Sequence, residues 1–362
     1  MSIDRVRASG RPPHDRECAS ARAGQYAESG AQGAVDGVTF TTTVLLAPSR
    51  SMQAHLGTQR PCRPLQVRSI DTAFKRALQA NAFEARVHSV FEHVINLDRC
   101  KGELFTLAAR GMDNAPCTAI VDIDNFTAAG IAVDEPVVAI EGVLHVGERL
   151  VLHLDSATIW QARLPRYTAR PRLMSDQLRA ARSYLARHEV RGGMSVQGGV
   201  EGAFALKVAT ALEHRSTSLL NALAEQRHAD ACRYAVSMLG LGPGLTPSGD
   251  DFLVGLFAVL NVAGSPCHGL LDGGTTVLKY ATDATNAISL AALTAAADGR
   301  VRESIASLID TLMHGTTTTL DEPLRRVLAI GASSGADLVA GIVAGLELNL
   351  QVKATRSVMS PL

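Results

Sequence analysis

Residues Gly240–Phe252 have the sequence GLGPGLTPSGDDF, which holds more turn-forming residues than a simple connection between two helices needs. Apolar residues recur every three or four positions on both sides of it, in Ala229–Leu239 and in Ser248–Val262, so we expect a helix on each side. The leading glycines permit positive φ, and Pro247 stiffens the chain just before the second helix. The stretch therefore predicts a rigid turn that presents backbone N–H groups at the start of a helix.

The same helical spacing extends in both directions from this motif, and it predicts an all-helical domain over residues 172–352. A glycine-rich stretch inside that domain, Gly192–Gly202, predicts a flexible loop. The predicted helices are Ser175–Arg187, Gly202–Leu212, Thr217–Arg227, Ala229–Leu239, Ser248–Val262, Thr275–Ala297, Glu303–Met313, Glu322–Ile330 and Ser334–Leu350.

The part of the chain before the helices has a different pattern, with short runs of Val, Ile and Leu separated by Gly, Asp, Asn and Pro. Such runs are typical of an antiparallel sheet or a small barrel. One or two helices are expected earlier, over Val67–His93, from apolar residues every three or four positions. The predicted class is therefore α+β: an N-terminal antiparallel β-sheet or small barrel over residues 65–165, followed by a larger all-helical domain. The predicted strands are Leu104–Ala109, Cys117–Ile123, Val137–Val146, Leu150–Leu154 and Ala157–Gln161.

Composition narrows the functional class. A net charge of +0 and an aromatic content of 4% argue against a nucleic-acid surface, and the apolar runs are too short to cross a membrane. The six cysteines form no C-x-x-C pair, which favours reduced thiols in a cytoplasmic protein. Residues 1–36 are rich in Arg, Ser, Gly and Pro without periodicity, so we expect a disordered leader there. A small-molecule substrate or a protein partner fits this composition best.

The motif has a counterpart 86 residues further along the chain. SGDDFLVGL from Ser248 and SGADLVAGI from Ser334 share the pattern S-G-x-D-Φ-x-x-G-Φ, where Φ is apolar. Ser-x-x-Asp has the form of a helix-capping box, which is a purely structural explanation. The repeated glycines also permit close approach of another backbone. We infer that the two helices face each other and bring both N-termini together, where free N–H groups and helix dipoles favour an anion.

The candidate site residues follow from this pairing. Asp251 suits the capping role, and Asp250, about 100° around the helix, is then the freer carboxylate that faces a ligand. Two carboxylates repel a phosphate unless a cation or an Arg or Lys side chain intervenes. Either Mg²⁺ bridges them to the ligand, or one carboxylate caps the helix while the other orients a polar donor, and no metal ligands are assigned. The predicted catalytic residues are Asp250 and Ser248. The predicted ligand-binding residues are Gly242, Gly244, Thr246, Gly249, Asp251, Ser333, Ser334 and Asp337.

Two common motifs are excluded as explanations of these residues. The turn is not a nucleotide-binding P-loop, because it lacks Gly-Lys-Ser/Thr and follows a helix rather than a strand. Gly331–Gly335 matches the G-x-S-x-G of serine hydrolases, but a predicted helix precedes it and the last histidine, His314, lies upstream. A serine hydrolase is therefore disfavoured.

The stretch GLGPGLTPSGDDFLVG resembles the family of the third subunit of oxamate carbamoyltransferase from anaerobic allantoin breakdown, the AllH-like proteins. Asn286–Gly299 (NAISLAALTAAADG) and Gly331–Gly341 (GASSGADLVAG) are similar too, and the likeness covers roughly residues 65–350. The resemblance implies a subunit that takes part in phosphorolysis of an N-carbamoyl compound such as oxalurate to carbamoyl phosphate and oxamate. It also implies two partner subunits, one related to acyl-CoA synthetases, and phosphate or carbamoyl phosphate at Gly242–Ser248.

Two other functions stay open at this point. In one, the chain is a non-catalytic assembly or anion-sensing subunit whose motifs only cap helices. In the other, it is a stand-alone Mg²⁺-dependent phosphohydrolase.

Overall fold

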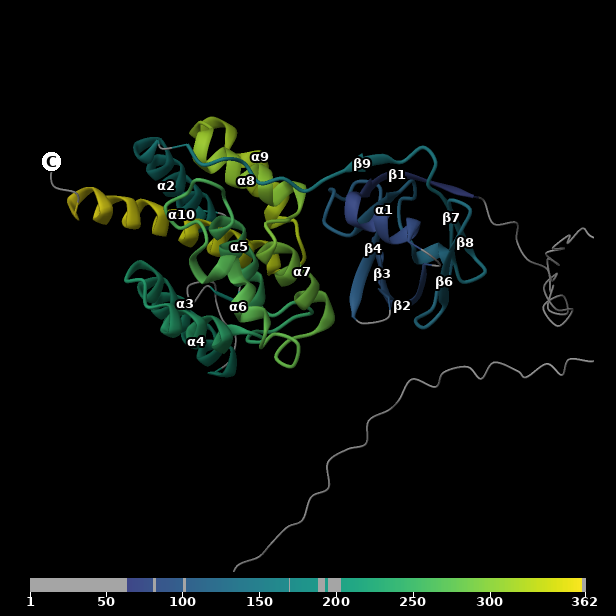
Figure 1. Ribbon diagram of the computed structural model, residues 1–362, viewed down its shortest axis with the longest axis horizontal. Coiled ribbons are helices and arrows are strands. Elements are labelled where there is room, and N and C mark those ends of the chain that lie inside the picture. Colours follow the sequence, from purple (N-terminus) through teal and green to yellow (C-terminus); the bar gives the residue numbers. More distant parts are fainter. Residues whose placement is uncertain are drawn as a thin grey trace, which may run out of the picture. The chain divides into compact units, whose positions relative to one another are not determined.

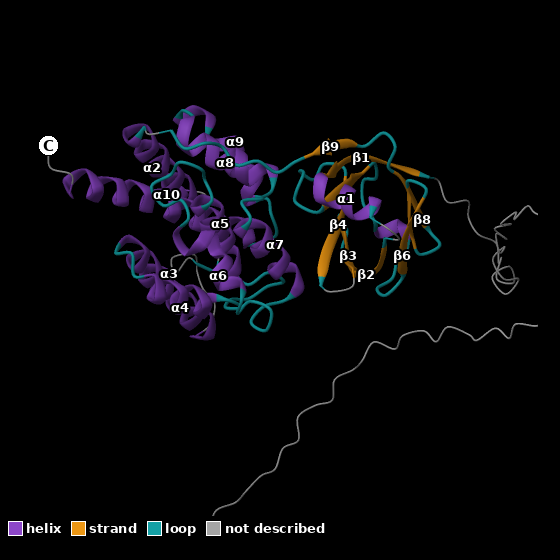
Figure 2. Cartoon of the chain, in the orientation of Figure 1, coloured by secondary structure: helices purple, strands orange, loops and turns teal. Residues whose placement is uncertain are grey.

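The computed structural model describes residues 64–80, 83–99, 102–168, 170–187, 193–194 and 203–359 (Figure 1). The predicted leader over residues 1–36 and most of the expected loop Gly192–Gly202 lie outside these residues. Strands occupy the first part of the described chain and helices the second (Figure 2), which confirms the predicted α+β class.

The strands of the described residues form a closed barrel. They are β1 (Leu65–Asp71), β2 (Glu84–Val90), β3 (Val94–Arg99), β4 (Glu103–Ala109), β5 (Thr118–Val121), β6 (Pro136–Ile140), β7 (Val143–Val146), β8 (Leu150–His153) and β9 (Thr158–Trp160). Their order is β5-β4-β3-β2-β6-β7-β8-β1-β9, and β1 also pairs with β5, which closes the ring. The barrel is thus one of the two predicted forms. Most neighbours are antiparallel as predicted, but β4–β5, β1–β8 and β1–β9 are parallel.

The predicted helical stretch Val67–His93 is wrong for most of its length. It contains β1, the short helix α1 (Thr72–Gln79) and β2, because a strand that turns directly into a helix mixes two apolar periods in one window. Asp71 ends the strand and caps the helix, since its carboxylate accepts from the N–H of Ala73 at 3.0 Å. Strand β3 was not predicted, whereas the five predicted strand regions are all confirmed.

Aromatic packing fixes α1 to the barrel. The Phe74 ring of α1 is fully buried, with its centroid 4.7 Å from that of Phe105 on β4 and 5.9 Å from that of Phe83. These three rings belong to one apolar core built from the barrel strands and α1. The predicted strand Val137–Val146 is the hairpin β6–β7, turned by Glu141 and Gly142, which both have positive φ as a two-residue type I′ turn requires.

The helical part begins at residue 171. Its helices are α2 (Pro171–Arg187), α3 (Ala203–Ala224), α4 (His228–Met238), α5 (Ser248–Leu260), α6 (Thr275–Leu278), α7 (Ala287–Ala297), α8 (Glu303–His314), α9 (Asp321–Leu328) and α10 (Ser334–Met359), with 3₁₀ turns at Thr127–Ala129, Leu270–Gly274 and Thr317–Thr319. Two predicted helices join to form α3. The predicted helix Thr275–Ala297 is divided instead, because the Asn286 side chain accepts from the N–H groups of Ile288 and Ser289 and starts α7 afresh.

Helices α5 and α10 form the centre of this part, and every residue of α5 is buried. A Cβ added to Gly255 would lie 2.3 Å from the carbonyl oxygen of Leu338, and one added to Gly341 would lie 2.1 Å from that of Phe252. The two contacts are equivalent, because the offset of 86 residues between the motifs relates Gly255 to Gly341 and Phe252 to Leu338. The helices therefore run parallel about a local two-fold axis, N-terminus beside N-terminus, which confirms the pairing inferred from the sequence.

Helix α10 is apolar for much of its length. By length and composition alone Ser334–Lys353 would be long enough to cross a membrane, but 67% of its most apolar stretch is buried inside the protein. Its buried side chains, such as Val339, Ile342 and Leu346, belong to the same apolar core as α5. Its apolar character is thus accounted for by its place at the centre of the helical part.

Candidate functional site

A cleft of about 1590 Å³ lies between the barrel and the helices. Its helical wall includes Gly244–Thr246 of the motif turn, Asp251 of α5, parts of α7 and α9, and residues 329–334 before α10. Its barrel wall is formed by β3, β4 and the loop over residues 111–118. Both copies of the repeated motif therefore reach the same cleft.

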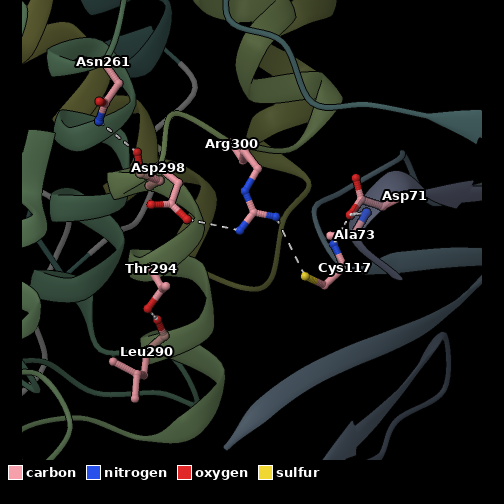
Figure 3. Close-up of polar contacts among 9 residues, drawn as sticks. Asp71, Ala73, Cys117, Asn261, Leu290, Thr294, Asp298 and Arg300 are labelled. Carbon is pink, nitrogen blue, oxygen red and sulfur yellow. Dashed lines mark hydrogen bonds and ion pairs between the residues drawn. The ribbon is translucent and has the colours of Figure 1, made fainter. Parts of the chain in front are cut away.

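Arg300 connects the two walls (Figure 3). Its guanidinium extends from the loop after α7 to the Cys117 thiol, with Nη1 at 4.0 Å from Sγ, and pairs with the Asp298 carboxylate at 3.3 Å. Cys117 has a φ of +54°, and its N–H donates to Asp71 at 2.9 Å, so the carboxylate that caps α1 also holds this residue. Burial raises the pKa of the Cys117 thiol, which keeps it protonated and argues against a nucleophilic role.

A second contact joins the walls at Asp113. Its carboxylate accepts from Arg302 Nη1 and from the N–H of Ser304, both at 2.9 Å, and it therefore caps the start of α8. The Arg302 guanidinium and these N–H donors hold the pKa of Asp113 below its usual value despite burial. Beside it, the N–H of Glu303 donates to the Asn114 carbonyl at 2.9 Å. The barrel loop is thus fixed against the helices that form the cleft.

The motif turn has the conformation that its sequence predicts. Gly240, Gly242 and Gly244 have φ values of 68°, 126° and 105°, so each needs a residue without a side chain. Space is restricted as well, since a Cβ on Gly240 would lie 2.1 Å from the Ala284 carbonyl oxygen. The N–H of Gly249 donates back to the Leu241 carbonyl at 2.8 Å, which closes the turn against the start of α5.

Asp250, the residue predicted to face a ligand, is not part of the cleft lining. Its side chain is fully buried and accepts from the N–H of Gly240 at 2.9 Å and from the Thr285 hydroxyl. Burial raises the pKa of Asp250 above its usual value, and these donors offset only part of that rise. Asp250 holds the turn to the start of α7, because it is the residue of the pair that points away from α10 and from the cleft.

Of the two neighbouring carboxylates of α5, Asp251 is the one that lines the cleft. Its Oδ2 accepts from the Thr246 hydroxyl at 2.9 Å, and Thr246 Oγ1 lies 2.7 Å from Ser334 Oγ of the second motif. Burial, with smaller effects of the Asp337 and Asp250 carboxylates, raises the pKa of Asp251 to about 7, although the two hydroxyls lower it. A carboxylate beside a cleft is thereby set to gain and lose a proton near neutral pH.

Asp337 and Ser248 form the symmetry-related half of this arrangement. Asp337 accepts from the N–H groups of Gly193 at 3.3 Å and Met194 at 2.9 Å, and burial raises the pKa of Asp337. The fully buried Ser248 hydroxyl lies beside Asp337 and lowers its pKa, yet it completes no hydrogen bond of good geometry. Backbone thus covers this half, whereas the half with Asp251 is open to the cleft.

The capping-box prediction is wrong for both motifs. Pro247, not Ser248, is the N-cap of α5, and no side chain caps that position. Ser334 Oγ contacts Thr246 Oγ1 across the helix pair rather than its own backbone. Asp251 accepts from the Thr246 hydroxyl and Asp337 from the N–H of Met194, so neither carboxylate closes a capping box. The helix α9 before Gly331–Gly335 confirms that a serine-hydrolase elbow is absent there.

The predicted site residues divide into two groups. Those that line the cleft are Gly244, Thr246, Asp251, Ser333 and Ser334. Those that are not part of its lining are Gly242, Ser248, Gly249, Asp250 and Asp337. Three carboxylates meet at the paired helix N-termini, but no group of three His, Cys, Asp or Glu among the described residues has an arrangement that could hold a metal ion.

Arginines on the cleft wall were missed by the sequence reasoning. Arg325 and Arg326 of α9 line the cleft beside residues 329–334, and Arg300 and Arg302 line it beside the barrel. Arg325 is paired with Glu322 at 2.6 Å. A usable signal was present, because these residues form two closely spaced pairs in a chain with only 19% charged residues.

Two family models match the chain. The model for oxamate carbamoyltransferase subunit AllH matches residues 238–346, a range that contains both copies of the motif, and the model for the AllH family N-terminal domain matches residues 66–159, the barrel. No solved structure matches the chain. The two matched ranges together span more than half of the residues, and they meet at the cleft described above. The chain therefore belongs to the AllH family of oxamate carbamoyltransferase subunits.

Proposed function

We propose that this chain is a subunit of a carbamoyltransferase complex that converts an oxalurate-like N-carbamoyl compound and phosphate to carbamoyl phosphate and oxamate or a related amide. The observation that carries the proposal is the cleft, because both matched family ranges contribute to its walls and both copies of the motif reach it. Membership of the family supports the reaction class, and a subunit implies other chains in the complex.

The cleft offers the groups that such a transfer needs. Oxalurate carries a carboxylate, and phosphate carries two negative charges near neutral pH, so both need cations. Arg325 and Arg326 supply guanidinium groups on one wall, and hydroxyls of Thr246 and Ser334 lie on the neighbouring stretch of the same wall. Burying two anions together is unfavourable unless cations accompany them. We therefore assign phosphate and the oxalurate carboxylate to the two arginines, and the uncharged carbamoyl group to the two hydroxyls. Positioning and electrostatic stabilisation then carry the reaction.

This assignment replaces the phosphate site expected at Gly242–Ser248. The N–H groups on either side of that stretch are already used within the protein: Gly249 N–H donates to the Leu241 carbonyl, and Gly240 N–H donates to the Asp250 carboxylate. We place the complex in anaerobic allantoin breakdown, a branch of purine catabolism, in the cytoplasm. Its proposed partners are two further subunits, one of them related to acyl-CoA synthetases.

Arg326 gives the most direct test of the proposal. The complex, purified with its partner subunits, is supplied with oxalurate and phosphate, and carbamoyl phosphate is measured. We expect Arg326→Ala to raise KM for an anionic substrate about tenfold or more, since a charged hydrogen bond is worth about 1.5–3 kcal/mol. Arg179→Ala is the control, because Arg179 is an exposed residue of α2 that does not line the cleft.

Two outcomes would refute this function. A complex that forms no carbamoyl phosphate from any N-carbamoyl acid would exclude it, and equal KM values for the two arginine variants would exclude the cleft as the site. Thermal unfolding adds a second readout, because oxalurate should protect the wild-type complex more than the Arg326→Ala complex.

A non-catalytic assembly or anion-sensing subunit is the second candidate. It is favoured by Asp250 and Asp337, whose carboxylates are bonded to backbone N–H groups and serve the fold. In that case, cleft variants would leave turnover of the complex unchanged while altering its assembly or its response to anions.

A further inference from the structure

Two hydroxyls and a carboxylate form a continuous chain from the cleft into the helix pair. Ser334 Oγ lies 2.7 Å from Thr246 Oγ1, and Thr246 donates to Asp251 Oδ2 at 2.9 Å. The Thr246 hydroxyl has one proton, and Asp251 receives it, so in its contact with Thr246 the Ser334 hydroxyl is the donor. The Ser334 hydroxyl is also close enough to the Asp251 carboxylate to lower its pKa directly. All three residues line the cleft, and Asp251 is only 7% exposed. The chain of donors therefore runs in one direction, from the cleft to the carboxylate.

The symmetry-related half of the helix pair lacks this series of hydrogen bonds. Position 246 is matched by Ala332 in the second motif, so the equivalent hydroxyl does not exist there. Asp337 instead accepts from the backbone of Gly193 and Met194, which do not line the cleft. At the same helix position, Asp251 is therefore linked by hydroxyls to the cleft, whereas Asp337 is bonded to backbone N–H groups away from it.

From this arrangement we infer that Ser334, Thr246 and Asp251 form a proton relay for carbamoyl transfer, with Ser334 in contact with the substrate and the other two acting through it. The inference rests on the proposed function. In the transfer, a phosphate oxygen bonds to the terminal carbamoyl carbon of oxalurate, and the bond from that carbon to the inner nitrogen breaks. The phosphate loses its hydroxyl proton and the leaving nitrogen gains one.

The relay balances these two protons. Ser334 accepts the phosphate proton while passing its own to Thr246, and Thr246 passes its own to the Asp251 carboxylate. Reversal of the same shifts delivers a proton to the nitrogen of oxamate, so no other acid or base is consumed. The charged and titratable groups that face Asp251 are Asp250 on its own helix and Asp337 on α10, while the α9 arginines line the same cleft.

The test compares pH–rate profiles of the purified complex in the direction of phosphorolysis. We expect Thr246→Val and Asp251→Asn to lower kcat about 100-fold or more, the size of an acid–base contribution. Thr246→Ser should restore most of the rate, because it keeps the hydroxyl. Asp337→Asn removes a carboxylate that repels the ionised form of Asp251, so the acid limb of the profile should move to lower pH. Phosphate has an ionisation of its own in this range, and it is common to every variant.

The outcomes separate the relay from the proposed function. Absence of carbamoyl phosphate in the wild-type complex would refute the function itself. A wild-type complex that is active, with Thr246→Val as fast as Thr246→Ser, would overturn the relay and leave the function standing. An unshifted acid limb in Asp337→Asn would overturn Asp251 as the titrating group. Circular dichroism and thermal melting of each variant establish that a loss of rate is not a loss of fold.

Discussion

The exchanged glycine contacts between α5 and α10 lead to a sharp prediction for Gly341→Ala. The new Cβ would lie 2.1 Å from the carbonyl oxygen of Phe252 and 2.9 Å from the backbone nitrogen of Leu256. Backbone atoms in a fully buried helix cannot turn aside, so the cost lies at the upper end of the overpacking range, about 3 kcal/mol. Alanine returns about 1 kcal/mol of helix propensity. We therefore expect Gly341→Ala to lower the free energy of unfolding by about 2 kcal/mol.

That loss is measurable by thermal unfolding. The roughly 280 residues that the structure describes give an unfolding entropy of about 0.6 kcal/mol per kelvin, so the melting temperature should fall by about 3 °C. Gly255→Ala should cost a similar amount, because its contact with the Leu338 carbonyl, at 2.3 Å, is the same contact exchanged. Gly345→Ala is the matched control on α10, since its nearest neighbour is the Val259 side chain at 2.9 Å and it should lose less. Gly341→Ala and Gly345→Ala variants that are both stabilised, as propensity alone predicts, would refute the parallel helix contact.

Three further outcomes are expected. Asp250→Ala should cost about 2 kcal/mol, because the Gly240 N–H and the Thr285 hydroxyl lose their acceptor, whereas Ser248→Ala, which breaks no hydrogen bond, should cost much less; urea unfolding compares the two. Asp113→Ala should also cost about 2 kcal/mol in the same assay, since Arg302 and the Ser304 N–H lose their acceptor. Wild-type stability should fall as pH rises from about 4 to about 7, because the folded state binds the Asp251 proton more tightly than the unfolded state. The difference in melting temperature between pH 5 and pH 8 should therefore be smaller in Asp251→Asn than in the wild type. An equal difference would contradict the assignment.

The parts of the fold that were predictable are those in which one periodicity operates alone. The glycine turn, the parallel helix pair and the strands after residue 100 each show a single pattern, and the structure contains them. Val67–His93 failed because β1, α1 and β2 follow one another almost without a break, and a window that spans all three has no single period. Closure of the barrel through β1 and β5 depends on contacts far apart in the sequence, which local patterns do not report.

For the candidate site, the sequence pointed to the turn and helix start that reach the cleft, but it assigned the outward-facing position to Asp250, whereas Asp251 lines the cleft. Helix geometry predicts that the Asp250 and Asp251 side chains diverge by about 100°, but it does not indicate which of the two is directed toward α10. That direction is decided by Gly240 and Thr285, which take the Asp250 carboxylate, and Thr285 lies 35 residues away. The arginines of the cleft belong to helices and loops whose position beside the motif depends on tertiary packing alone.

The parallel course of α5 and α10 has an electrostatic consequence. Each helix N-terminus carries about half a positive charge, and a parallel pair brings two such ends together, which is repulsive. Asp250, Asp251 and Asp337 lie at these two ends and bring the protein's own negative charge there, but burial raises the pKa of all three carboxylates and so limits that charge. A chain with uncharged residues at these positions would keep the same two helix ends but would have to recruit its anion from solution.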